Sequence, residues 1–265
     1  MLPPMQIQTA DEVWARIAEA AAATQKHGGR GVLATDADGT LWSGDVGDDL
    51  FRAFIDRATV HAPALDGIKR EARDHGLSDA GSGSDVARRI LAAYEAGSFP
   101  EERIFEIMAW CFAGATRGEA LAFARDALSR VGLEGRMHRE VMGLLARARQ
   151  AGLDVLLVSA SPLAAVLAGG QRAGFDEAHV VAARARYDGD RMLPEAERPI
   201  PYAGGKVVRL REHLGPDRPL LAAFGDNAFD VDLLKSAQVG VAVRPKPRLR
   251  ERAAMVPGLV ELKAE

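Results

Sequence analysis

Apolar residues follow two different patterns along the chain. Short continuous apolar runs predict buried strands in "GVLAT", "LDVLLVS", "AHVVAA", "PLLAAFGD" and "VGVAV". Between these runs, apolar residues recur every three or four positions, which predicts helices over roughly 136–151, after Pro162, from about Lys206 and in "AFDVDLLKSA". Short strands that alternate with helices indicate a doubly wound α/β fold, in which helices cover both faces of a mostly parallel sheet.

No convincing strand pattern occurs between about residues 44 and 135. Four segments there repeat apolar residues at helical spacing between Gly, Pro, Ser or Thr boundaries: "DDLFRAFIDRA", "DVARRILAAYEAG", "PEERIFEIMAWCFAG" and "TRGEALAFARDALSRVG". This segment is therefore predicted to be all-helical. Near the beginning, Thr9 and Glu12 predict a capping box for an Ala-rich helix that ends at Gly28-Gly29. The Pro-rich segment "LPEAERPIPYAGG" is predicted to be a loop.

Composition limits the classes of protein to consider. A chain of 265 residues with 48% hydrophobic residues can form one sizeable core with an inserted subdomain, or two small domains. A net charge of -3 without a basic run gives no reason to expect a nucleic-acid partner. One cysteine excludes an internal disulfide framework and fits a reducing compartment.

Neither targeting nor membrane segments are expected. The start "MLPPMQIQTADEVW" lacks a basic region followed by an apolar stretch, so no signal peptide is predicted. The most apolar stretch, "LDVLLVSASPLAAVLAGG", is interrupted by Asp154, Ser159 and Pro162 and is too broken to span a bilayer. We therefore expect a cytoplasmic protein without a membrane partner.

Polar side chains follow three of the predicted strands. Asp36 and Asp38 end the first, Ser159 ends the second and Asp226 ends another, while Lys206 opens a helix after two glycines. The carboxyl ends of parallel strands meet at one edge of a sheet, which is where such folds bind their ligands. These groups are therefore expected to meet in one site.

The residue types in this predicted site favour phosphoryl chemistry. Three carboxylates at one edge repel one another unless a cation lies among them, and an oxygen-only ligand set suits Mg²⁺. A hydroxyl and an ammonium group beside the metal suit the oxygens of a phosphoryl group. One Asp can attack phosphorus, and a second acid two residues later can protonate the leaving oxygen and then deprotonate water.

The motifs resemble those of the haloacid dehalogenase (HAD) superfamily of phosphohydrolases. "ATDADGT" resembles motif I, which implies that Asp36 is the nucleophile and a metal ligand. The same motif implies that Asp38 is the general acid and base, and that its backbone carbonyl also binds Mg²⁺. By the same resemblance, Thr40 steadies the nucleophile loop.

The other three motifs follow in the family's order. "LLVSAS" resembles motif II with Ser159, and "GGKV" resembles motif III with Lys206. "FGDNAFD" resembles motif IV, with Asp226 as a metal ligand and with Asp230 and Asn227 in support. The residues expected to contact phosphate or substrate are Gly39, Thr40, Asp45, Ser159, Ala160 and Lys206.

The position of the helical segment also resembles this family. Roughly 120 residues separate Asp36 from Ser159, far more than one crossover needs. Residues 45–135 resemble a helical C1 cap inserted into a core of residues 1–44 and 136–265, as in the phosphoserine-phosphatase-like branch. Asp45 lies in the flap where that branch often carries a Glu that meets the substrate's amino group. Ala160 and Ser161 stand where its serine-specific enzymes usually have Gly-Gly.

Simpler interpretations exist for each residue alone. The Asp pair could form a turn, Ser159 could cap the next helix and Lys206 could be solvated. Asp226, Asn227 and Asp230 could together cap a helix. Five further residues have no predicted catalytic part. Cys111 is expected to be a packed thiol, and Trp42 either packs under the flap or meets substrate. Arg184, Arg186 and Tyr202 are expected to be solvated near the mouth of the site.

The combined prediction is a Mg²⁺-dependent phosphomonoester hydrolase that acts on a small phosphorylated metabolite through an aspartyl-phosphate. The alternatives are a phosphotransferase or mutase of the same superfamily, and a sensor that binds a phosphometabolite without turning it over. Asp38 favours phosphate over carbon–halogen chemistry, because a halide leaves without protonation and the family's dehalogenases lack an acid at this position. The substrate and the oligomeric state are left open by the sequence.

Overall fold

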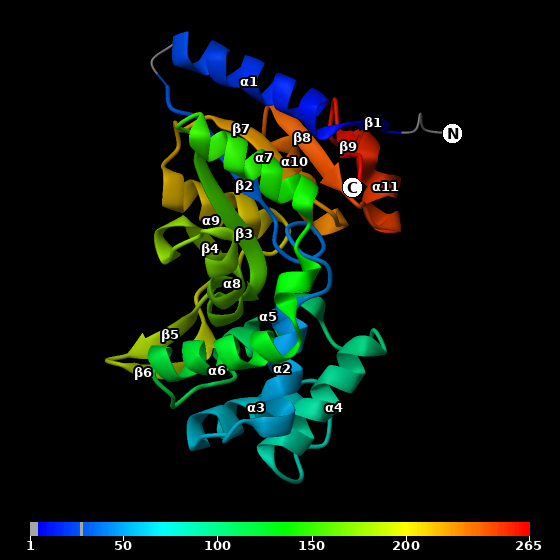
Figure 1. Ribbon diagram of the computed structural model, residues 1–265. Coiled ribbons are helices and arrows are strands. Elements are labelled where there is room, and N and C mark those ends of the chain that lie inside the picture. The colour runs from blue at the N-terminus through cyan, green and yellow to red at the C-terminus, as the bar shows by residue number, and fades with distance from the viewer. Residues whose placement is uncertain (1–4, 27–28) are drawn as a thin grey trace.

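The computed structural model describes residues 5–26 and 29–265. Its centre is a seven-stranded sheet in the order β1-β9-β8-β7-β2-β3-β4, and all neighbouring strands run parallel (Figure 1). The strands are β1 (Gln6–Gln8), β2 (Val32–Thr35), β3 (Asp154–Pro162), β4 (Val180–Ala183), β7 (Leu220–Gly225), β8 (Val239–Val243) and β9 (Val260–Leu262). All five strands predicted from apolar runs are present, and the doubly wound α/β class is confirmed.

Helices cover both faces of the sheet because its central strands are apolar on both sides. Leu33 of β2 packs into a cluster with α1 (Ala10–Lys26) and α7 (Arg139–Gln150), whereas Val32 and Ala34 point to the other face. That face is covered by α9 (Gly204–Leu214), α10 (Val231–Lys235) and α11 (Pro247–Arg252). The helix α8 (Leu163–Gly170) follows β3 and packs against β3 and β4.

The predicted capping box begins α1. The backbone N–H of Thr9 donates to Glu12 Oε2 at 2.7 Å, and the N–H of Glu12 donates to Thr9 Oγ1 at 3.3 Å. This reciprocal pair satisfies donors that a helix N-terminus leaves free, and it confirms the prediction. The predicted end of this helix at Gly28 lies outside the described residues.

Five helices form a separate layer beyond the carboxyl edge of the sheet (Figure 1). They are α2 (Val46–Arg57), α3 (Ala62–Asp74), α4 (Gly83–Glu95), α5 (Glu101–Trp110) and α6 (Arg117–Arg130). Four of them match the predicted segments, while α3 was not singled out by its pattern. They pack around large buried side chains such as Phe51, Phe54 and Trp110. The division into a core of 1–44 and 136–265 and a cap of 45–135 stays a prediction.

A hairpin occupies part of the segment that was predicted to be a loop. Strands β5 (Ala185–Asp188) and β6 (Arg191–Ala196) pair antiparallel and pack on α3 and α5. The loop prediction for "LPEAERPIPYAGG" was therefore wrong over residues 193–196. The sequence pattern of a strand is weak here because β6 carries a proline and charged residues. Met192 also joins β6 to the segment before α6, since its N–H donates to Ala115 O at 2.9 Å and its carbonyl accepts from Gly114 N at 2.8 Å.

Ion pairs of buried glutamates join the helical layer to the chain that leads into α9. Glu106 of α5 is buried and accepts hydrogen bonds from Arg198 Nε at 2.7 Å and from Arg198 Nη2 at 2.8 Å. Arg103 bridges Glu106 to the buried Glu71 of α3. Two-pronged arginine–carboxylate pairs fix geometry better than single contacts do. They position α5 over the start of α9, where the predicted site lies.

Two predictions about the whole chain can be compared with the structure. Within the described residues, no helix is long and apolar enough to cross a membrane. Cys111 is buried and its thiol donates to Met108 O at 3.4 Å. Burial raises the pKa of this thiol far above its usual range, which leaves it unreactive, as expected of a packed cysteine.

The helix α9 offers a matched test of packing. Leu210 is fully buried against β-sheet residues, whereas Val208, two positions earlier, is largely exposed. Leu210→Ala is expected to lower the free energy of unfolding by about 2–5 kcal/mol, because it removes buried methyl groups and leaves a cavity. Val208→Ala should change it by less than about 0.5 kcal/mol. Urea denaturation of both variants measures the difference, and equal effects would contradict the assigned faces of α9.

Candidate active site

The end of β2 places the first carboxylate at the carboxyl edge of the sheet. Asp36 follows β2 directly, and its N–H donates to Phe224 O of β7 at 2.9 Å, which continues the ladder. The chain then turns at Gly39, which has a φ of 85°. A Cβ on Gly39 would lie 2.1 Å from Asp226 Oδ2. A glycine is therefore required here, both by the left-handed backbone and by the approach of Asp226.

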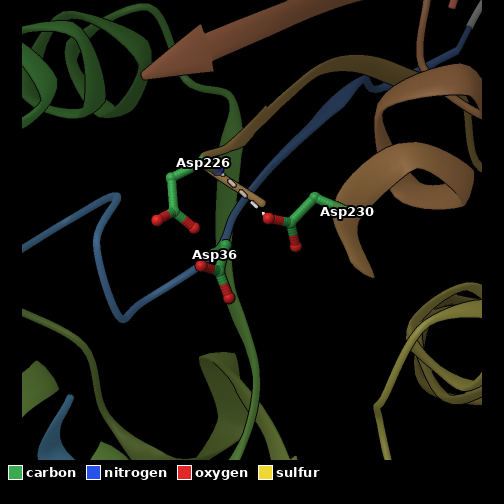
Figure 2. Close-up of side chains that lie close together, drawn as sticks. All are labelled: Asp36, Asp226 and Asp230. Atoms are coloured by element: carbon green, nitrogen blue, oxygen red, sulfur yellow. Dashed lines mark hydrogen bonds between the residues drawn. The ribbon is translucent and has the colours of Figure 1, made fainter. Parts of the chain in front are cut away.

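Three buried carboxylates meet beside this turn. Oxygens of Asp36, Asp226 and Asp230 all lie within 4.8 Å of one another, and the three residues are 5%, 2% and 1% exposed. Figure 2 shows them converging from the ends of β2 and β7 and from the short helical turn after β7. The structure thus brings together acids that lie about 190 residues apart in the sequence, as the sheet order requires.

The ammonium group of Lys206 lies between two of these acids. Lys206 Nζ is 2.5 Å from Asp36 Oδ1 and 2.6 Å from Asp230 Oδ1, and the lysine is 3% exposed. Burial alone lowers the pKa of Lys206, but the carboxylates of Asp230 and Asp36 outweigh it, so the pKa lies above its usual range. Lys206 is thus a permanent cation at the start of α9.

Asp230 is held in place by its own hydrogen bonds. Its Oδ2 accepts from the N–H of Asp226 at 3.1 Å (Figure 2). The same oxygen accepts from the N–H of Asn227 at 2.9 Å, while Oδ1 faces Lys206. Asn227 Oδ1 accepts from the N–H of Ala228 at 2.7 Å and completes a capping box. The capping interpretation and the site interpretation therefore both apply to Asp230, which positions Lys206 and the backbone of Asp226.

Asp38 is held by donors on one oxygen and by hydroxyls on the other. Its Oδ1 accepts from Trp42 Nε1 at 2.8 Å and from the N–H of Val46 at 2.7 Å. Its Oδ2 lies 2.7 Å from Ser161 Oγ and 3.3 Å from Ser159 Oγ. Hydroxyls can donate or accept, whereas an indole and a backbone N–H only donate. A proton on Asp38 therefore belongs on Oδ2, where it keeps its partners in either protonation state.

Residues at the end of β3 line the same pocket. Ser159 and Ser161 are buried, and the N–H of Ser161 donates to Ser159 Oγ at 3.1 Å. Ser159, Ala160 and Ser161 all line the cavity that contains Asp36 and Lys206. Thr40 is buried behind it, where its hydroxyl donates to Asp36 Oδ2 at 3.2 Å. Thr40 and Gly39 therefore position acids and do not line the cavity.

The flap after β2 carries Asp45 into the cavity. Asp45 Oδ1 accepts from the N–H of Asp48 at 2.9 Å and caps α2. Burial, and then the charge of Asp38, raise the pKa of Asp45 to about 7. Trp42 is fully buried under this flap. Of the two possibilities left open for Trp42, packing is therefore the one found.

The donor set fits Mg²⁺. Burial, and then the charge of Asp230, raise the pKa of Asp36 well above its usual range and that of Asp226 to about 6. Burial is the largest cause of both shifts, and a shortage of positive charge around the carboxylate oxygens leaves it uncompensated. A hard cation with oxygen ligands removes this shortage. Asp36 and Asp226 are the residues that would hold it, because one oxygen of Asp230 already accepts two backbone N–H groups and the other faces Lys206. Within the described residues, the carboxylates of Asp36 and Asp226 accept no backbone N–H group and contact side chains alone.

A cavity of about 150 Å³ joins these groups to the helical layer. Tyr94 of α4 and Glu101 and Phe105 of α5 form its far side, together with Tyr202 and Phe229. The expectation that Tyr202 is solvated was wrong, since its ring lines the cavity and its hydroxyl lies 3.1 Å from Glu101 Oε2. Tyr202 lies here because the chain before α9 packs under α5.

The two arginines expected near the mouth lie elsewhere. Arg184 lines a separate and largely apolar cavity of about 160 Å³ between α6, α8 and the β5–β6 hairpin. Arg186 lies on the exposed face of β5. Neither lines the cavity of the carboxylates. Both arginines follow β4 closely in the sequence but do not lie at its end of the sheet. The chain leaves the sheet to form the hairpin and returns to the site at Tyr202.

Sequence reasoning missed two groups that contact the acids. Ser161 binds Asp38, and Lys246 Nζ lies 2.8 Å from Asp226 Oδ2. Ser161 could have been found, because alternation along β3 places it on the same face as Ser159. Lys246 had no such signal. It reaches Asp226 because its own N–H donates to the Asp226 carbonyl at 2.8 Å, which places the loop after β8 beside β7.

Comparison with sequence families gives one match over most of the chain. The family described as haloacid dehalogenase-like hydrolase matches residues 33–235. This range contains Asp36, Asp38, Ser159, Lys206 and Asp226. A search of curated proteins found no match.

Several solved structures have a similar fold. A protein of unknown function from Bordetella pertussis Tohama I has a TM-score of 0.65 at 23% identity, over 88% of this chain and 99% of that one. A functionally unknown protein from Anaerococcus prevotii DSM 20548 has a TM-score of 0.65 at 14% identity, over 100% and 98%. A phosphoserine phosphatase, solved as a phospho-aspartyl intermediate analogue, has a TM-score of 0.50 at 16% identity, over 89% and 95%. These likenesses establish the fold.

The ion pairs of Lys206 can be tested by a double-mutant cycle. Lys206→Met, measured in EDTA, should lower the free energy of unfolding by about 3 kcal/mol, because it leaves two buried carboxylates facing each other. Adding Asp230→Asn to this variant should recover part of the loss, since one of the two charges is removed. Lys235→Met, on an exposed lysine of α10, is the matched control and should have little effect. Additive losses in the double variant would contradict a shared network.

Proposed function

The chain belongs to the haloacid dehalogenase-like hydrolases, and from this premise we propose that it is a Mg²⁺-dependent phosphatase of small phosphate monoesters. The observation that carries the proposal is the pairing of two differently held carboxylates. Asp36 lies against the ammonium of Lys206, whereas Asp38 is held by donors on Oδ1 and faces hydroxyls with Oδ2. With a metal cation offsetting its raised pKa, Asp36 is suited to react as an anion, whereas Asp38 is suited to exchange a proton with its hydroxyl-facing oxygen.

Asp36 is the proposed nucleophile of the first step. One of its carboxylate oxygens forms a bond to phosphorus while the bond between phosphorus and the ester oxygen breaks. The leaving oxygen takes the proton from Asp38 Oδ2 and departs as an alcohol. Lys206 and the hydroxyl of Ser159 lie in the same cavity and stabilise charge on the phosphoryl oxygens. The enzyme then carries an acyl phosphate on Asp36.

Water completes the reaction with the same acid–base pair. Asp38, now ionised, takes a proton on Oδ2 from a water molecule, whose oxygen attacks the phosphorus of the aspartyl-phosphate. The bond between phosphorus and Asp36 breaks, inorganic phosphate leaves, and Asp38 is again protonated. Ser161 and Ser159 keep their contacts with Oδ2 throughout, because each hydroxyl can turn from donor to acceptor.

Mg²⁺ is proposed for the space between Asp36 and Asp226. When bound, it supplies positive charge that offsets repulsion between the carboxylates and the phosphate dianion. Asp230 holds the backbone of Asp226 in place, and Lys246 contacts the Asp226 carboxylate from the side of β8. The carbonyl of Asp38 is the further ligand that the family resemblance implies.

Two other activities are separated from this proposal by product analysis. A phosphotransferase or mutase would pass phosphate to an added alcohol. The proposed enzyme should release inorganic phosphate from p-nitrophenyl phosphate when no such alcohol is present. A non-catalytic sensor would bind phosphate and release none. The two hydrogen bonds that position Asp38 support turnover over sensing, because binding alone needs no acid in this position.

The nucleophile can be tested with an isosteric change. Asp36→Asn should lower kcat for p-nitrophenyl phosphate by about a thousandfold or more, since an amide is a poor nucleophile and no covalent intermediate can form. Asp190→Asn, on the exposed turn between β5 and β6, is the matched control and should keep full activity. Circular dichroism checks that both variants are folded. Substantial turnover by folded Asp36→Asn would refute the assignment.

Metal dependence can be measured without turnover. Beryllium fluoride with Mg²⁺ should raise the melting temperature of the wild-type protein, because a ligand at a hundred times its Kd adds about 2.7 kcal/mol of stability. Neither component alone should produce the full shift. Treatment with EDTA should abolish phosphatase activity, and Mg²⁺ should restore it. An unchanged melting temperature at saturating ligand, or activity indifferent to EDTA, would remove the metal from the proposal.

A further inference from the structure

The part of the cavity lining that lies beside α5 is acidic and aromatic. Glu101 and Asp45 supply carboxylates there, and the rings of Phe105, Tyr202 and Phe229 form one continuous arc. The ring centroids of Phe105 and Tyr202 are 5.6 Å apart, and those of Tyr202 and Phe229 are 4.8 Å apart. Aromatic faces beside carboxylates form a typical surface for binding a cation.

Cations able to bind an anionic leaving group are lacking on this side. Within the described chain, no arginine lines the cavity, and its two lysines both contact the acids of the phosphoryl end. Arg248 is exposed and does not line the cavity. A carboxylate on the leaving group would therefore face Glu101 without compensation.

Charge balance in the cavity favours a cationic alcohol. Six carboxyl groups and two ammonium groups line it. With Asp38 protonated for the first step, five carboxylates remain, so that even a bound divalent cation leaves the lining negative before the phosphate dianion enters. The six carboxyl groups are those of Asp36, Asp38, Asp45, Glu101, Asp226 and Asp230. A positive charge on the substrate, placed at the acidic and aromatic end, reduces this excess. The cavity of about 150 Å³ suits a compact alcohol.

We propose that the substrates are phosphate monoesters of small amino alcohols that carry no carboxylate, and that Glu101 is the residue that selects their ammonium group. This inference rests on the proposed phosphatase activity and deepens it. Glu101 is only partly buried, and Tyr202 holds it in place through the hydroxyl at 3.1 Å. The aromatic arc accepts either a primary or a methylated ammonium, whose common chemistry is a cation at one end of a short chain.

A substrate panel with three variants tests the inference. Inorganic phosphate release is measured for phosphoethanolamine, phosphocholine, O-phosphoserine and glycerol 3-phosphate, which present a primary ammonium, a quaternary ammonium, an added carboxylate and a neutral alcohol. The kcat/KM of wild-type enzyme should be about tenfold higher for at least one of the first two than for the last two. Comparison of the first two identifies the preferred degree of methylation.

The variants separate selection of the cation from general damage. Glu101→Gln should lower the ratio of kcat/KM between the preferred cationic ester and glycerol 3-phosphate by about tenfold. Tyr202→Phe, which keeps the ring and removes the hydroxyl, should lower it less. Glu102→Gln, on the exposed neighbour of Glu101 in α5, is the matched control and should leave the ratio unchanged. Thermal melting confirms that each variant is folded.

The possible failures are distinguishable. If glycerol 3-phosphate or O-phosphoserine is hydrolysed as well as the cationic esters, or if Glu101→Gln leaves the ratio unchanged, the inference is wrong while the phosphatase stands. If none of these esters nor p-nitrophenyl phosphate is hydrolysed in Mg²⁺, the proposed function itself fails. A preference for a cationic ester that is lost in Glu101→Gln and kept in Glu102→Gln supports the inference.

Discussion

The buried ammonium of Lys206, shared by Asp36 and Asp230, is the contact on which the rest of the site depends. Burying a charge is costly unless it is paired, and here each of the two acids would in turn be costly without the lysine. The three groups come from the end of β2, the turn after β7 and the start of α9. Those three segments must therefore be placed to within a hydrogen-bond length, which the strand order β7-β2-β3 and the packing of α9 achieve together.

Such close placement needs backbone with no side chain at three points. A Cβ on Gly39 would overlap Asp226, one on Gly225 would lie 2.5 Å from Asp230 Cβ, and one on Gly205 would lie 2.1 Å from Ile200 O. The absence of a side chain at Gly205 lets the first turn of α9 pack on the preceding loop. That contact sets the position of Lys206 and brings Tyr202 under α5. The close packing at Gly205 thus places residues in two parts of the cavity, Lys206 beside the acids and Tyr202 beside α5.

The sequence predicted what depends on local pattern and missed what depends on tertiary contact. The central strands were found because they are apolar on both faces, whereas β1 and β9 have three residues each and β6 is polar and interrupted by Pro194. The acids at strand ends and Lys206 follow from topology, so their meeting could be predicted. Lys246 and Glu101 could not be placed in this way, because the first depends on the loop after β8 and the second on how α5 lies over α9.

The far end of the cavity joins two parts of the molecule that the sequence separates. Glu101 lies in the helical layer and Tyr202 in the chain that enters α9, and the contact between them exists only while α5 lies over the sheet edge. The pair of the buried Glu106 with Arg198 joins the same two segments farther along α5. Any movement of α5 away from the chain before α9 would therefore separate Tyr202 from Glu101. The pair proposed to select the alcohol would then form only when these two segments lie together, so that selection of the alcohol and exclusion of water would occur in the same step.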